Sequence, residues 1–144
     1  MQNRAARDPR PPTPDPALPM ASKLDGPGTA KMATLDDATM AMQRLHGLVE
    51  RMAVAVKSGE GSQLYGAQIK RFGAPLVGQL KGQFGTIADQ VTKLLLDASR
   101  GGNENLKVRT LREGIAQIRT ALDIAAAKVK EKHTIGDDED STAA

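Results

Sequence analysis

Few residues in this sequence have types and spacings that suit catalysis or metal binding. It contains no cysteine and only two histidines, His46 and His133, so thiolate chemistry is excluded and one chain cannot supply a multi-histidine metal site. Adjacent carboxylates occur at Asp36 and Asp37, which we expect at a helix start, where negative charge complements the helix dipole. We therefore expect no metal site, no cofactor and no catalytic site.

His46 is the strongest single candidate for catalysis, because an exposed imidazole can exchange protons or carry a phosphoryl group near neutral pH. Helical bundles that carry a phosphohistidine usually have a lysine three residues after the histidine and then a glycine. This sequence has Val49 and Glu50 at those places, and the Glu50 carboxylate would repel a phosphoryl group on His46. A His-based phosphotransfer bundle is therefore our third hypothesis, and we expect the protein not to be an enzyme.

Basic side chains offer a second kind of chemistry, which is contact with the phosphate backbone of nucleic acid. The chain has a net charge of +3. Its candidate phosphate contacts are Arg109, Arg112, Arg119 and Lys128. Acidic residues are interleaved with them, and aromatic residues make up only 2% of the sequence, which leaves few rings to stack on bases. A basic architectural nucleic-acid-binding protein is the alternative hypothesis, and we rank nucleic acid below protein as a partner.

His46 belongs to a predicted helix over residues 35–57, capped by Thr34 with Asp37 three residues later. Its apolar residues repeat with the alternating spacing of three and four that is typical of a coiled-coil seam. One row of this seam is Leu35, Met42, Val49 and Val56, and the adjacent row is Ala38, Leu45 and Met52. We expect the seam to lie at the centre of the fold.

The same helix carries more apolar residues than its seam uses. Met40, Leu48 and Val54 lie outside the two rows, whereas a surface helix usually has a polar side as wide as its apolar one. The helix should therefore be covered on more than one side, by its own chain or by another. We predict that these three residues, with His46 beside the seam, form a partner or oligomer interface.

A second helical region is predicted over residues 62–99, and Pro75 within it should kink or break the helix. Three glycines follow at Gly78, Gly82 and Gly85, and each costs a helix about 1 kcal/mol relative to alanine. Because a glycine lets helix axes approach closely, we interpret these three as further interface positions.

A third helix is predicted over residues 104–132, after a glycine-rich turn. Its apolar positions keep the spacing of three and four: Val108, Leu111, Ile115, Ile118, Leu122, Ala125 and Val129. Lysines near its end complement the C-terminal end of the helix dipole.

The predicted fold is all-α, an antiparallel three-helix bundle or coiled coil over residues 34–135, with four helices if the second breaks at Pro75. Residues 1–33 contain most of the prolines and are predicted to be a disordered leader. Residues 136–144 are predicted to be a disordered acidic tail. No apolar run is long enough to cross a membrane, and we expect a soluble, cytoplasmic protein.

These features favour a non-enzymatic helical interaction or assembly protein, with a structural or scaffold role. We expect it to form homo-oligomers, or to dock the helices of a partner protein, through the apolar faces of its first helix.

Overall fold

The structure is a computed structural model, and it describes residues 23–134. Within these residues it contains four helices: α2 (Gly26–Lys57), α3 (Gln63–Lys81), α4 (Gly85–Ser99) and α5 (Glu104–His133). The all-α prediction is confirmed, and the helix predicted over 104–132 matches α5 closely. Residues 1–22 and 135–144, which include most of the predicted leader and the acidic tail, lie outside the described residues.

The first helix begins at Gly26 rather than at residue 35, so the predicted leader is wrong for residues 26–33. Asp25 is the N-cap, and its carboxylate accepts a hydrogen bond of 2.6 Å from the Gly28 amide. Pro27 is compatible with a first helical turn, where no backbone amide is needed. Thr34, which was predicted to be the cap, is inside the helix and donates its hydroxyl to the Ala30 carbonyl.

The second helical region divides at residues 82–84 and not at Pro75, which lies inside α3. The region therefore forms two helices, as in the four-helix alternative, but the break that this alternative placed at Pro75 is wrong. A proline removes one backbone hydrogen bond, whereas the glycines at positions 78, 82 and 85 each lower helix propensity in the same short stretch. The chain therefore reverses where the glycines gather.

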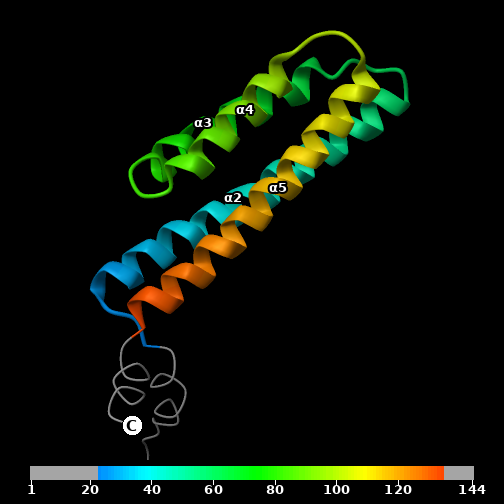
Figure 1. The fold of residues 1–144 in the computed structure, drawn as a ribbon. Coiled ribbons are helices and arrows are strands. Elements are labelled where there is room, and N and C mark those ends of the chain that lie inside the picture. The colour runs from blue at the N-terminus through cyan, green and yellow to red at the C-terminus, as the bar shows by residue number, and fades with distance from the viewer. Residues whose placement is uncertain (1–22, 135–144) are drawn as a thin grey trace, which may run out of the picture.

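The helices pack in the order α2, α3, α4, α5, with α5 returning to α2. Figure 1 shows that α2 and α5 form a long antiparallel pair, and that the α3–α4 hairpin covers only one part of it. With 32 and 30 residues, α2 and α5 are roughly 48 and 45 Å long, against roughly 28 and 22 Å for α3 and α4. The molecule thus has a four-helix part and a two-helix part.

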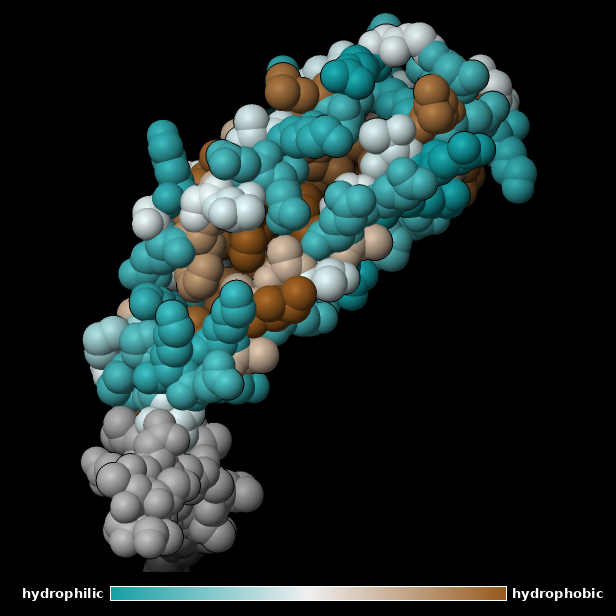
Figure 2. Space-filling view, in the orientation of Figure 1, coloured by the Kyte–Doolittle hydropathy of each residue, from teal (hydrophilic) through white to brown (hydrophobic). Residues whose placement is uncertain are grey.

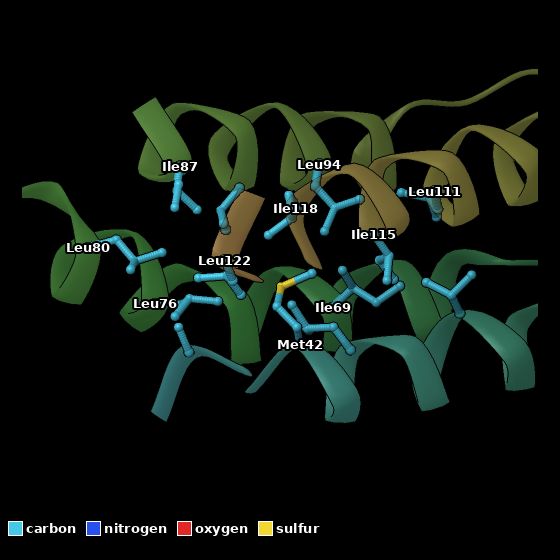
Figure 3. Packing of buried hydrophobic residues seen from close by; sticks show 14 of the residues in the cluster. Met42, Ile69, Leu76, Leu80, Ile87, Leu94, Leu111, Ile115, Ile118 and Leu122 are labelled. Carbon is cyan, nitrogen blue, oxygen red and sulfur yellow. The ribbon is translucent and has the colours of Figure 1, made fainter. Parts of the chain in front are cut away.

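The core of the four-helix part is aliphatic, and it contains the seam that the sequence predicts (Figure 3). All residues of the two seam rows are buried except Val56, which packs against the core from its edge. On α5 the buried residues are Val108, Leu111, Ile115, Ile118, Leu122 and Val129. Among the described residues, no helix is both long enough and apolar enough to span a membrane.

Close packing between helices occurs at glycines that the sequence analysis did not select. A Cβ atom at Gly66 would lie 2.5 Å from the Ala98 carbonyl oxygen, and one at Gly73 would meet the Leu95 side chain. These two glycines let α3 lie directly against α4. By contrast, a Cβ built at residues 78, 82 or 85 would have nothing within 4 Å among the described residues except its chain neighbours and the adjoining helix backbone.

The free ends of α2 and α5 are joined by a small polar cluster. The Asp25 amide donates to the His133 carbonyl at 3.0 Å, and the Asp25 carboxylate lies 3.1 Å from His133 Nδ1. Lys31 Nζ lies 3.3 Å from His133 Nε2. An ionised carboxylate can only accept, so the His133 ring donates from Nδ1 to Asp25. Gly28 fits beneath the His133 side chain, with no room for a Cβ.

Candidate interaction surface

The candidate surface is the side of α2 that neither α3 nor α5 covers. We call it the outer face of α2, and its residues are all exposed: Ala33, Asp36, Asp37, Met40, Gln43, Arg44, Gly47, Arg51, Val54 and Lys57. Met40 and Val54 are 66% and 67% exposed. These are the two large apolar residues of the predicted interface that the fold leaves exposed, and Gly47 lies midway between them in the sequence.

The outer face continues onto α3 beside Met40. A groove between the two helices is lined by Met40, Arg44, Phe72 and Pro75, among others. Phe72 is itself partly exposed, and the Arg44 guanidinium lies 5.9 Å from the centre of its ring, a distance that suits a cation–π contact. Exposed apolar surface therefore extends from Met40 on α2 to Phe72 on α3, with the Arg44 guanidinium beside it.

Leu48 belongs to the core rather than to the outer face. It is only 6% exposed, and it is part of the same buried cluster as the seam. The excess apolar width of α2 is thus covered in two ways, by α5 on one side and by α3 on the other. Leu48 faces one of these covered sides, so it cannot contribute a contact to a partner without unfolding.

His46 lies outside the core and takes part in a surface ion network between α2 and α5. Its Nε2 atom is 3.5 Å from the Glu50 carboxylate. Glu50 accepts two hydrogen bonds from the Arg112 guanidinium, at 2.7 and 2.8 Å. The Arg112 contact holds the pKa of Glu50 below its usual value, and Glu50 raises the pKa of Arg112. The carboxylate beside His46 is therefore anionic at neutral pH.

The four predicted phosphate contacts do not form one surface. Arg112 is paired with Glu50, and Arg109 lies near Val54 in the groove between α2 and α5. Lys128 is nine residues after Arg119, which places it on the opposite side of α5 at about 100° per residue. By the same measure Arg109, Arg112 and Arg119 fall within about 80° of one another, so Lys128 is the residue that separates the four cations into two sides of the helix.

A second exposed apolar area lies where the α3–α4 hairpin ends. Figure 2 shows apolar residues gathered beside the hairpin tip and along the adjoining part of α5, on a face that is otherwise mostly polar. On α5, Ile124 is 52% exposed, and Ala121 and Ala125 are partly buried against the core. We call this area the hairpin step. It is the alternative candidate for a surface of protein–protein contact, beside the outer face of α2.

A buried polar cluster joins the starts of α3 and α5, and sequence reasoning missed it. Ser62 is fully buried; its hydroxyl donates to Glu104 at 2.8 Å and accepts from Lys107 at 3.1 Å. Ser62 precedes its two partners by more than forty residues, so no local pattern could have revealed the cluster. Because the hydroxyl is already engaged by an acid and a protonated amine, we assign it a structural role.

Within residues 23–134 there is no group of three or more histidine, aspartate or glutamate residues that could hold a metal ion. Comparison of the chain with protein families, curated proteins and solved structures gives no match.

Proposed function

We propose that this chain is a non-enzymatic helical assembly protein that self-associates through the outer face of α2. The observation that carries the proposal is the exposure of Met40 and Val54, two large apolar side chains on one face of a helix whose other sides are buried. Large apolar residues that recur on one exposed face commonly mark a site of protein–protein contact. A cytoplasmic location belongs to the same proposal.

The magnitude of the apolar contribution indicates weak association. Complete burial of a large aliphatic side chain contributes about 1.5–3 kcal/mol. Met40 and Val54 of two copies, each about two-thirds exposed, would together contribute roughly 4–8 kcal/mol. The loss of translational and rotational freedom costs about 4–15 kcal/mol. We therefore expect an equilibrium that depends strongly on protein concentration and draws on neighbouring contacts such as Phe72.

The proposal is tested by light scattering on the full chain across a wide range of concentrations. Wild type should pass from monomer to a larger species as concentration rises. Met40→Glu and Val54→Glu should each shift this transition to higher concentration, because a buried carboxylate at the interface has no partner. A wild-type chain that stays monomeric throughout the range would contradict the proposal.

Leu96→Glu is the matched control, because Leu96 is 62% exposed but lies on α4. It should leave the concentration dependence unchanged. Ile124→Glu examines the hairpin step in the same way. If that variant abolishes association while Met40→Glu and Val54→Glu do not, the outer face of α2 is the wrong surface.

A further inference from the structure

We infer that two copies of this chain pair antiparallel along α2, with Gly47 of each copy at a two-fold axis. This inference rests on the proposed self-association and adds to it the partner, the direction and the register. A two-fold interface uses the same patch on both copies, so each residue must suit the residue that the symmetry brings opposite it.

The apolar residues of the outer face are arranged symmetrically about Gly47. Met40 precedes Gly47 by seven residues and Val54 follows it by seven, so an antiparallel pair places Met40 of each copy opposite Val54 of the other. At Gly47 the surface is open: apart from its chain neighbours and the backbone of its own helix, nothing in the described residues lies within 4 Å of an added Cβ. The missing side chain lets the two backbones approach at the axis, between the two apolar contacts.

The symmetry also matches apolar residues on α3. Phe72 lies beside Met40 in the groove between α2 and α3. Leu64 is exposed near the start of α3, which follows the end of α2 that carries Val54. Phe72 thus adds apolar surface beside Met40, and Leu64 is an exposed apolar residue of α3 nearer in sequence to the end of α2 that carries Val54. An antiparallel pair brings the half with Met40 and Phe72 over the half with Val54 and Leu64.

The ends of the face carry opposite charges. Asp36 and Asp37 lie at one end and Lys57 at the other, all exposed. Antiparallel pairing about Gly47 brings Asp36 of each copy to Lys57 of the other. Parallel pairing would place the carboxylates together and the lysines together, which is unfavourable. The charge pattern therefore selects the antiparallel direction.

One like-charge approach occurs in this register, between Arg44 of one copy and Arg51 of the other. Arg44 lies over the Phe72 ring, which draws its charge toward α3 and away from the axis. The proximity of Arg44 and Arg51 also makes this register testable by a charge reversal. Arg51→Glu should strengthen association, because the new carboxylate would meet Arg44 of the second copy.

The test uses single cysteines, which is straightforward because the natural chain has none. Gly47→Cys is placed at the axis, and Ala33→Cys lies on the same face fourteen residues away. In the antiparallel pair the two Ala33 positions are separated by roughly 42 Å along the helices. Under mild oxidation of the full chain, Gly47→Cys should form a disulfide dimer about tenfold faster than Ala33→Cys, because proximity raises the effective concentration of its thiols.

The outcomes separate this inference from the proposed function. Equal cross-linking at both positions indicates parallel pairing and overturns the register. If wild type associates but neither cysteine cross-links, self-association stands and the Gly47 axis is wrong. A chain that is monomeric by light scattering overturns both.

A charge exchange gives an independent check on the register. Asp36→Lys should abolish the dimer mass, and adding Lys57→Asp to the same chain should recover it. Failure of the double variant to recover the mass, with its helices intact by circular dichroism, would overturn the predicted pairing of these two residues.

Discussion

The carboxylate of Asp25 stabilises the start of α2 and its attachment to the end of α5. It accepts a hydrogen bond from the Gly28 amide and another from the His133 ring. The Gly28 contact is the main reason that the pKa of Asp25 lies below its ordinary value of 3.8, and His133 and Lys31 lower it further. The folded state therefore stabilises the ionised carboxylate of Asp25. This contribution to the free energy of unfolding is fully present at pH values above the ordinary pKa, and it is lost as pH falls through the folded-state pKa.

The corresponding prediction is that Asp25→Asn lowers the thermal midpoint of unfolding at pH 7 but not at pH 2. The asparagine keeps the hydrogen-bonding oxygen but lacks the charge at every pH. Thermal unfolding followed by circular dichroism between pH 2 and 7 should show the two midpoints converging below about pH 4. If the difference between the two thermal midpoints is the same at every pH in this range, the charge of Asp25 does not contribute to the stability of the fold.

At the scale of the helices, two sets of glycines that look alike in sequence have opposite roles. Gly66 is packed against the Ala98 carbonyl, whereas Gly78 is open to solvent in the same helix. Gly66→Ala should lower the free energy of unfolding by about 1–3 kcal/mol, because the added methyl forces α3 away from α4. Gly78→Ala should raise it by about 0.5–1 kcal/mol, because alanine favours the helix.

Urea denaturation of the two variants measures both effects, and each variant is the control for the other. Opposite signs are expected. If both substitutions stabilise the chain, α3 and α4 are not in close contact at Gly66.

At the scale of the whole molecule, the uneven helix lengths divide the protein into regions of different local stability. The ends of α2 and α5, about residues 26–34 and 125–133, extend past the hairpin and contact mainly each other (Figure 1). Residues 42–52 and 111–118 lie in the four-helix core. Fewer packed neighbours make local opening easier.

Amide hydrogen exchange should therefore be faster in the two-helix ends than in the four-helix core. The polar cluster at His133 should slow it near residues 25–28, and His133→Ala should remove that protection without affecting residues 42–52. Uniform protection along α2 would contradict the division into two parts. The measurement is best made at low concentration, where the proposed dimer does not add protection of its own.

The start of α2 and the break between α3 and α4 were both predicted wrongly, although residues close to each boundary indicate it. Asp25, Gly26 and Pro27 form an ordinary helix start, yet the surrounding prolines led to their assignment to a leader. The three glycines after Pro75 each lower helix propensity close to the break at residues 82–84, whereas Pro75 itself lies inside α3. Both boundaries are therefore encoded by residues that adjoin them in the sequence.

The sequence by itself determined the helices, the seam of α2 and the apolar row of α5, because an apolar repeat is a local property that fixes which side of a helix is buried. It could not determine which remaining apolar residues the chain covers. Leu48 is buried and Val54 exposed because α3 and α5 approach α2 from particular directions. Likewise, only the tertiary structure brings Glu50 to Arg112 and Gly66 to Ala98, because these contacts depend on where separate helices meet.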